Sequence, residues 1–426
     1  MPNLLRYALL LALLLGMSAG GLAVADEPPA SGIRQIVSKH LTLHTDLPAS
    51  AEVDALGEVF DQAFPQWCAY FGVDAAQHAD WHMRGYLMKS RERFEAAGLV
   101  SPELPQFPNG WAQGDQLWFF DQTSVYYRRH LLLHEGTHAF MAALASGTGP
   151  PWFSEGMAEL LATHRWQDGQ LTLNFFPLAR DDVPKWGRIE IVQTGFAERR
   201  AKSLSTIFAY DARAHLENEA YGWCWAAAAF LDGNPRYRAR FRQLHRLAGE
   251  PDFAARVSKL FAEDWQTLNE DWQVFVANLD YGYDFGRMQV DYASGAPLEG
   301  SSKRVTVAAD RGWQAGGIRL EAGKKYRLTA SGRYSVAQQP KVWPCEPGGI
   351  TIRYYHSQPL GILLAAVRSD DVQAKGSSGL TRPIVVGLDR TLSVDRPGTL
   401  YLRINDSAGS LSDNAGTFVV DISPGG

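Results

Sequence analysis

The order of apolar and polar residues divides this chain into two parts that differ in character. Between residues 32 and 285, short alternating runs typical of strands are interleaved with longer runs that carry apolar residues at helical spacing. Beyond about residue 287, short runs rich in Val, Ile, Leu and Tyr are separated by Gly, Asn, Asp and Pro, as in an antiparallel sandwich or barrel. The pattern therefore predicts an α+β domain over 26–286 and an all-β domain over 287–426.

The same periodicity predicts the individual elements of the first domain. Strands are expected at 38–46, 81–88 and 115–121. Helices are expected at 51–71, 90–98, 125–146, 152–164, 219–232 and 252–278. A Pro- and Gly-rich loop is expected at 101–114, before the strand-like run LWFF at 117–120. We interpret LWFF as a buried strand; the alternative is a strand that pairs with an extended peptide backbone.

The first residues carry the pattern of an export signal. Arg6 precedes a Leu/Ala run that reaches Leu15, and Ala23-Val24-Ala25 forms a small-residue cleavage site. We expect residues 1–25 to be a signal peptide and the mature protein to be secreted or periplasmic. The alternative is an uncleaved anchor, because the apolar stretch over 7–25 is nearly long enough to span a bilayer. No later segment is apolar enough to do so, and no transmembrane segment is expected after signal cleavage.

The composition indicates a globular protein that does not bind nucleic acid. Of 426 residues, 46% are hydrophobic and 20% are charged, which is ordinary for a globular chain. The net charge of −5 and the lack of a Lys/Arg run argue against a nucleic-acid partner. The three cysteines, Cys68, Cys224 and Cys345, leave at least one unpaired in a monomer, and a Cys68–Cys224 disulfide is one option in an oxidising compartment.

The segment HLLLHEGTH contains a candidate metal site. Its last five residues form an H-E-x-x-H motif, with His134 and His138 four residues apart. On a helix both imidazoles lie on one face and can reach one ion. Glu135, beside the first ligand, is suitably located to take a proton from the attacking water without binding the metal. The motif has only three fixed positions, so a third ligand is needed to support it.

The segment PPWFSEGMAE supplies acidic candidates for the third ligand. Pro151 can open a helix, which puts Glu155 in the first turn and Glu159 one turn later on the same face. A catalytic zinc takes three protein ligands and keeps one open position, and His-His-Glu is a standard set. We therefore predict zinc on His134, His138 and Glu155, with Glu159 hydrogen-bonded to a ligand imidazole and fixing its orientation.

These residues also allow other interpretations. Glu155 and Glu159 could be a solvated i,i+4 pair, or Glu159 could replace Glu155 as the ligand. His130 lies one turn before His134, but about 12 Å along the axis from His138, so His130 and His138 cannot share one ion. The metzincin pattern is excluded, because its glycine and third histidine are missing at the required spacing.

Together, HEGTH and WFSEGMAE resemble the gluzincin superfamily of metallopeptidases, where H-E-x-x-H is followed by a helix carrying W-[LF]-x-E-G-x-A-E. The resemblance is specific over about 130–232 and implies a zincin-like catalytic domain with Glu155 as zinc ligand and Glu135 as general base. A later helix in the family often carries a tyrosine that stabilises the oxyanion, and Tyr221 matches it here; packing in an aromatic-rich helix is the alternative. The G-x-M-E-N segment of the aminopeptidase branch has no counterpart in WAQGDQLWFFDQ, so aminopeptidase activity is not implied.

Residues 302–424 resemble a bacterial galactose-binding lectin with a small jelly-roll fold. The matching stretches include GIRLEAGKKYRLTASG, KVWPCEPGG, LGILLAAV and LYLRINDSAGSLSDNAGTFVVDI. The resemblance implies a jelly-roll or sandwich domain, with calcium on Asp406, Asp413 and Asn414, whose oxygen donors suit a hard cation. The lectin's sugar-contacting His segment has no clear counterpart here, and Asp/Asn-rich loops are often simple turns.

These observations predict a secreted zinc-dependent peptidase that acts on a peptide or protein substrate, with a C-terminal domain that tethers it to a glycan or to another protein. The alternative is a glycan- or protein-binding protein whose zinc domain is catalytically idle. The intact Glu135 argues against idleness, because a structural zinc site needs no base beside its ligand.

Overall fold

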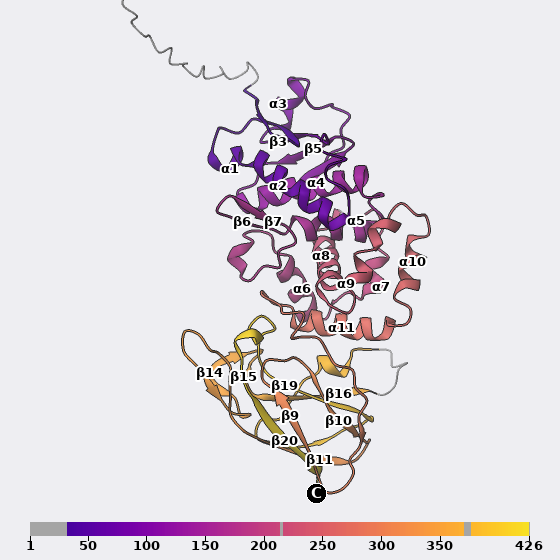
Figure 1. The fold of residues 1–426 in the computed structure, drawn as a ribbon, viewed down its shortest axis with the longest axis vertical. Helices are drawn as coiled ribbons and strands as arrows, with labels where there is room; N and C mark the ends of the chain where they lie inside the picture. The colour runs from indigo at the N-terminus through magenta and orange to yellow at the C-terminus, as the bar shows by residue number, and fades with distance from the viewer. Residues whose placement is uncertain (1–31, 214–215, 370–375, 426) are drawn as a thin grey trace, which may run out of the picture.

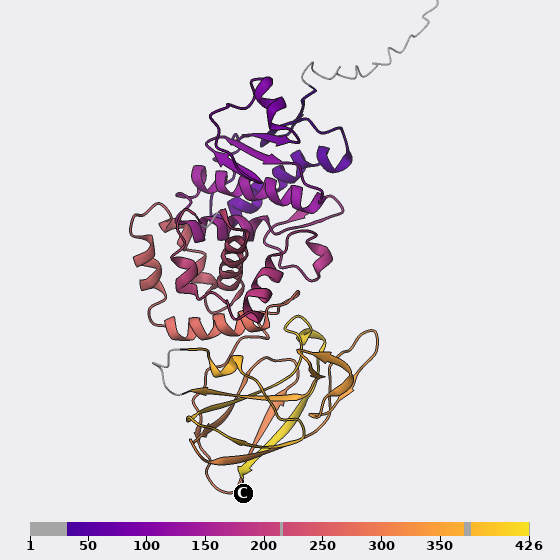
Figure 2. The ribbon, with the colours of Figure 1, turned by 180° about the vertical axis from the view of Figure 1, so that it is seen from behind.

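The computed structural model describes residues 32–213, 216–369 and 376–425, and the predicted signal peptide lies outside them. Figures 1 and 2 show an elongated molecule with a sheet and its helices at the N-terminal end, a helical region in the middle and a β-sandwich at the C-terminal end. Within the described ranges, no helix is both long and apolar enough to cross a membrane.

The N-terminal sheet has five strands in the order β1-β2-β3-β5-β4. The central strands β2, β3 and β5 run parallel, whereas β1 and β4 are antiparallel to their neighbours. Alternate residues face opposite sides, so Leu87 and Leu117 pack under helices α2 and α4 while Tyr86 and Trp118 pack under the 94–107 segment. The strands are β1 Arg34–Val37, β2 Leu41–Thr45, β3 Met83–Met88, β4 Gly110–Gln113 and β5 Gln116–Phe120.

The helical region packs around an aromatic-rich core. The α-helices of the described residues, including those that pack beside the sheet, are α1 Ala51–Asp54, α2 Leu56–Phe71, α3 Arg91–Ala96, α4 Val125–Leu144, α5 Pro151–Ala162, α6 Arg188–Ala197, α7 Leu204–Phe208, α8 Asn218–Gly233, α9 Arg238–Phe241, α10 Phe253–Leu260 and α11 Trp265–Asn278. A short hairpin, β6 Arg165–Gln167 and β7 Gln170–Thr172, follows α5. Helices α5 and α8 approach closely at Gly156, where a Cβ atom would lie 2.9 Å from the Cys224 carbonyl oxygen. This contact fixes α5, and with it Glu155, against α8.

The sequence predicted the elements that carry the candidate site more accurately than the segments around them. Helices α4, α5 and α8 and strand β5 agree with prediction to within two residues at each end. LWFF is a buried inner strand, so its pairing with a peptide is excluded by β3 and β4 on either side. The expected loop 101–114 is wrong in its last part, because residues 110–113 form the edge strand β4.

Two further expectations differ from the structure. The single helix expected over 252–278 is two helices, and Arg240 holds the break by donating to the Leu260 carbonyl and pairing with Asp264. Cys68 and Cys224 are buried free thiols, as is Cys345, so the optional disulfide is not formed. Cys68 lies on α2 and Cys224 on α8, each packed within the apolar core.

The C-terminal region is a β-sandwich, as predicted. One sheet has the order β17-β16-β19-β10-β8 and the other β18-β11-β20-β9. The strands are β8 Ala296–Pro297, β9 Lys303–Ala308, β10 Gln314–Leu320, β11 Lys325–Ser331, β16 Leu363–Ser369, β17 Ile384–Val385, β18 Asp389–Ser393, β19 Gly398–Ile404 and β20 Thr417–Pro424. Two smaller pairs are β12 Tyr334–Ser335 with β13 Pro344–Cys345 and β14 Ile350–Tyr355 with β15 Gln358–Leu360.

In the five-stranded sheet of the sandwich, strand β19 is buried on both faces. In β19, Leu400 and Leu402 point into the sandwich, whereas Tyr401 belongs to the apolar core of the helical region. In β16, Leu364 likewise joins that core. Figures 1 and 2 show α11 lying along this boundary, and the Arg368 guanidinium on β16 makes a bidentate ion pair with a glutamate of α11. The sandwich and the helical region therefore share a continuous apolar core.

Candidate metal centre

Helix α4 presents both histidines of the motif to one side. It begins after Ser124, whose hydroxyl accepts a hydrogen bond from the Tyr127 backbone N–H at 3.1 Å and caps the helix. Gly136 lets α2 approach closely, since a Cβ atom there would lie 2.7 Å from the Phe60 ring. The opposite side of α4 therefore carries His134 and His138 toward α5.

Helix α5 brings the third candidate ligand to the two imidazoles. Pro151 opens the helix, as predicted, and Glu155 follows one turn later. The Nε2 atoms of His134 and His138 lie 3.1 Å apart. Glu155 Oε2 lies 3.3 Å from His134 Nε2 and 3.5 Å from His138 Nε2. The three atoms form a nearly equilateral triangle.

This triangle fits a zinc ion. Two ligand atoms bound at about 2.1 Å in tetrahedral geometry lie about 3.4 Å apart, which matches all three sides. Glu155 Oε2 is buried and makes no hydrogen bond in the described structure. Burial raises the pKa of the Glu155 carboxyl, but the adjacent His138 and His134 outweigh it and hold that pKa well below its usual range. The anionic oxygen and two imidazole nitrogens are a donor set that zinc prefers.

Two further side chains lie beside the Nδ1 atoms of the histidine rings. Glu159 Oε1 lies 3.4 Å from His134 Nδ1, and Ser154 Oγ lies 3.1 Å from His138 Nδ1. Both contacts are made to Nδ1, so the Nε2 atoms of both rings face Glu155. A partner on the distal ring nitrogen fixes the tautomer and the ring orientation that a metal needs. The structure thus places Glu159 beside the imidazole of His134, a candidate ligand, although His134 Nδ1 makes no hydrogen bond among the described residues.

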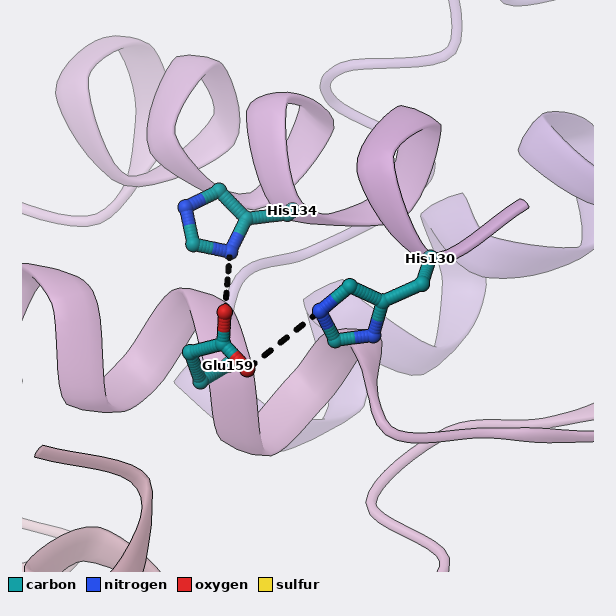
Figure 3. Close-up of side chains that lie close together, drawn as sticks. All are labelled: His130, His134 and Glu159. Carbon is teal, nitrogen blue, oxygen red and sulfur yellow. Dashed lines mark ion pairs between the residues drawn. The ribbon is translucent and has the colours of Figure 1, made fainter. Parts of the chain in front are cut away.

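A second group, His130, His134 and Glu159, also lies close together (Figure 3). His130 Nε2 lies 3.3 Å from Glu159 Oε2, while His134 faces the other oxygen. However, Arg188 donates to both Glu159 oxygens at 3.0 and 2.9 Å, and its charge repels a cation. His130 is fully buried and does not belong to the lining of the adjacent cavity. This group is better described as an ion-pair network that supports His134 than as a catalytic metal site.

Glu135 lies beside the triangle without belonging to it. Its carboxylate packs against Gly110 on β4, where a Cβ atom would lie 2.3 Å from Glu135 Oε1. Burial raises the pKa of Glu135, and the neighbouring His134 and His138 only partly offset this effect. A raised pKa brings the carboxylate closer to the pH range in which a general base works best.

Tyr221 reaches the same cavity from α8. Its ring centroid lies 6.0 Å from that of His134, and the Arg188 guanidinium lies 5.6 Å from the Tyr221 ring centre. Burial raises the pKa of the Tyr221 phenol, and the carboxylates of Glu155 and Glu135 raise it further. The phenol therefore stays protonated and can act as a hydrogen-bond donor.

These groups line a cavity of about 390 Å³. One wall is the segment 106–114, which includes the edge strand β4. Sequence reasoning missed this wall, and it missed the roles of Ser154 and Arg188. The Ser154 contact could have been suspected from its place beside Glu155, but Arg188 carries no motif and pairs with a residue 29 positions away.

The structure also brings together the three candidate calcium ligands of the sandwich. Asn414 Nδ2 donates to Asp406 Oδ2 at 2.9 Å, and the Oδ1 atoms of Asp413 and Asn414 are buried without a hydrogen-bond partner in the described structure. Burial raises the pKa of Asp406 to about 6, and the hydrogen bond from Asn414 opposes the rise. Calcium binding and glycan binding stay predictions, because these contacts do not show that either ligand binds.

The loop that carries these residues packs on the helical region. Ser407 Oγ donates to Asp280 Oδ2 at 3.1 Å, and the Asp284 backbone N–H donates to the Ala408 carbonyl at 3.1 Å. At Gly409 a Cβ atom would lie 2.1 Å from the Tyr281 carbonyl oxygen. The loop that resembles the lectin's calcium loop is therefore partly covered by this chain's own residues.

Comparison with known proteins gives only distant likenesses. No family model matches the chain, and no curated protein matches it. A lectin structure, the EclA N-terminal domain described as a PllA-like lectin, is 23% identical, with a TM-score of 0.22, and covers 29% of this chain and 95% of its own. An aminopeptidase N family protein from Idiomarina loihiensis is 10% identical, with a TM-score of 0.35, over 92% of this chain and 68% of its own.

The IMPa metallopeptidase is a third likeness. Its complex with T-antigen is 11% identical to this chain, with a TM-score of 0.19, and the similarity covers 83% of this chain. This chain spans 38% of the IMPa chain. Another IMPa structure, from Pseudomonas aeruginosa, has the same TM-score at 13% identity. All of these TM-scores are too low to establish a shared fold, so the assignment of function depends on the site itself.

Proposed function

We propose that this chain is an exported zinc-dependent peptidase. The observation that carries the proposal is the triangle of His134 Nε2, His138 Nε2 and Glu155 Oε2, with sides of 3.1 to 3.5 Å, at the wall of a cavity that also holds Glu135 and Tyr221. Three ligands with an open side and a buried carboxylate nearby are the components of a hydrolytic zinc site.

The chemistry divides between the ion and the side chains. When bound, zinc would polarise the scissile carbonyl and lower the pKa of water. Glu135 accepts a proton from the attacking water and passes it to the leaving amine nitrogen. The Tyr221 hydroxyl donates a hydrogen bond to the carbonyl oxygen as negative charge develops on it. Glu159 and Ser154 keep the two imidazoles oriented throughout.

The cavity wall suits a peptide substrate. Strand β4 has a neighbour on one side only among the described strands, so its other edge offers backbone N–H and C=O groups. An extended peptide can add to such an edge as a further strand. Because Gly110 of β4 touches Glu135, a peptide paired with β4 runs past the general base.

Hydrolysis of an unfolded protein tests the proposal. The zinc-loaded mature protein is incubated with reduced, alkylated casein, and new amino termini are counted. Glu135→Gln should lower the rate by at least about 100-fold while zinc content stays the same, because only the base is lost. Glu52→Gln, the same change at an exposed position of α1, should have no effect.

The alternative is a binding protein with an idle zinc domain. It predicts no proteolysis by the wild type and no effect of Glu135→Gln. Equal, background-level rates for the wild type and Glu135→Gln would therefore favour it over the peptidase.

We also propose a calcium ion on Asp406, Asp413 and Asn414. The support is the two buried oxygens without donors, since a cation would satisfy both. Millimolar calcium should raise the melting temperature of the wild type but not that of Asp413→Ala. Glycan binding at the same loop is tested by adding galactose to the calcium-loaded protein in the same assay.

Export is proposed from the sequence alone. Expression with residues 1–25 intact should yield a mature protein that starts at Asp26, which N-terminal sequencing of the secreted or periplasmic fraction detects. An unprocessed chain retained in the membrane fraction would favour the anchor instead.

A further inference from the structure

The wall of the cavity extends past the general base in both directions. The lining segment 106–114 has Gly110, the residue against Glu135, near its middle. On one side, β4 continues for three residues to Gln113, about 10 Å at about 3.3 Å per residue. On the other side, Gln106 to Asn109 continue the wall. A chain that lies along this wall has room on both sides of the bond beside Glu135.

The charged groups of the cavity are already engaged with one another. Its described ionisable residues, apart from the tyrosines, are His134, Glu135, His138, Glu155, Glu159 and Arg188. The two histidines face Glu155, and Arg188 is bidentate to Glu159. Glu135 is the proposed base. Among the described lining residues, no further carboxylate or cation remains.

A peptide terminus needs an opposite charge to be held inside a cavity. An α-ammonium or α-carboxylate that loses water without an ionic partner is strongly destabilised. The other polar side chains of the described lining are neutral as well. They are the amides of Gln106, Asn109, Gln113 and Asn218, the hydroxyls of Thr148, Ser154 and the two tyrosines, and the Trp111 indole. Amides can bond to peptide backbone and to uncharged side chains, but they do not neutralise a terminus.

From these two observations we infer that the site is that of an endopeptidase, which cleaves internal peptide bonds between uncharged residues and does not select a free amino or carboxyl terminus. The inference rests on the proposed function. The reaction adds the water oxygen to the carbonyl carbon and breaks the C–N bond. One water proton reaches the amine nitrogen through Glu135, which gives a new amine. The other stays with the water oxygen in a new carboxyl group, which becomes a carboxylate when it releases that proton to solvent.

The test uses one uncharged peptide sequence of about ten residues in three forms. One has both ends blocked by acetyl and amide groups, one has a free amino end, and one has a free carboxyl end. Mass spectrometry of the products from zinc-loaded protein gives the cleaved bonds and their rates. We expect the three forms to be cut at the same internal bonds, with rates within about threefold of one another.

Two outcomes overturn the inference in distinguishable ways. Loss of single residues from a free end, with the blocked peptide intact, would show an exopeptidase and leave the proposed peptidase function standing. No cleavage of any form, in a sample that holds zinc and also fails on casein, would remove the proposed function itself. Glu135→Gln run in parallel supplies the background rate.

A second peptide set tests the charge preference. Lys or Asp replaces the residue on either side of the cleaved bond, one at a time. Each change should lower kcat/KM by about tenfold or more, because no partner for the charge is present among the described residues of the lining. Equal or faster cleavage of a charged variant would contradict this part of the inference.

Discussion

Glu159 Oε1 lies 3.4 Å from Nδ1 of His134, and the same carboxylate receives two hydrogen bonds from Arg188. Burial raises the pKa of Glu159, but Arg188 and His130 hold it well below its usual range, so the carboxylate stays ionised although it is buried. One anionic side chain thus lies beside a candidate metal ligand and neutralises a buried guanidinium.

Replacement of Glu159 should therefore have two effects. Glu159→Gln removes the anion that orients His134, and zinc affinity should fall by about 10- to 100-fold. It also leaves Arg188 without its counter-charge, and the free energy of unfolding should fall by about 3–5 kcal/mol. Competition with a zinc-binding dye and denaturant unfolding measure the two quantities. Unchanged zinc affinity would contradict the role assigned to Glu159.

Ser154→Ala separates the two effects. The Ser154 hydroxyl contacts His138 Nδ1 but neutralises no charge. Zinc affinity should fall by about tenfold, whereas stability should change by no more than about 1 kcal/mol. A large loss of stability in this variant would point to a structural rather than an orienting contact.

Replacement of Tyr221 should lower the rate of hydrolysis without changing the zinc content. Loss of one donor to a developing oxyanion costs about 100-fold in kcat. Tyr221→Phe should show this loss with unchanged zinc content and little change in KM. Tyr127→Phe is a matched control, because this tyrosine lines the same cavity but its hydroxyl accepts a hydrogen bond from Arg188. Equal rates for Tyr221→Phe and the wild type would leave Tyr221 as a packing residue.

The contact between Gly110 and Glu135 should be intolerant of a methyl group. In Gly110→Ala the new Cβ would lie 2.3 Å from Glu135 Oε1, so the carboxylate or the strand must move. A displacement of about 1 Å at a catalytic group can cost about 100-fold in rate. We expect kcat/KM to fall by that order while zinc content is retained. Wild-type activity would show that the base does not depend on β4.

The shared core predicts that the sandwich and the helical region unfold together. Leu364 is buried on the outer face of β16, among residues of the helical region. Leu364→Ala should cost about 2–4 kcal/mol and shift a single calorimetric transition. Leu363→Ala, the neighbour that points into the sandwich, should shift the same transition. Two separate transitions, with only one moved, would contradict a common cooperative unit.

The sequence indicated the candidate metal ligands because their spacing is local. His134 and His138 are one helical turn apart, and Pro151 sets the start of the helix that carries Glu155. These relationships can be recognised without knowledge of the tertiary fold. The Glu159–Arg188 pair could not be predicted, since its partners lie on different helices and neither shows a pattern that identifies the other.

Strand β4 and the interface between the two regions were missed for different reasons. The segment NGWAQG is short, lies between glycines and has no alternating pattern, so it resembles a loop until β5 pairs with it. Strand β19, by contrast, carries apolar residues on both faces in TLYLRI, a signal that both faces are buried. The sequence contained that signal, but only the structure shows that the helical region covers the second face of β19.

The most direct test of the central claim is the zinc content of the mature protein and of Glu155→Ala, measured by inductively coupled plasma mass spectrometry after zinc reconstitution and dialysis. We expect about one zinc ion per chain in the wild type and in the control Glu52→Ala, and a strongly reduced content in Glu155→Ala, because one of three ligands is lost. A folded wild type that retains no zinc would contradict the account.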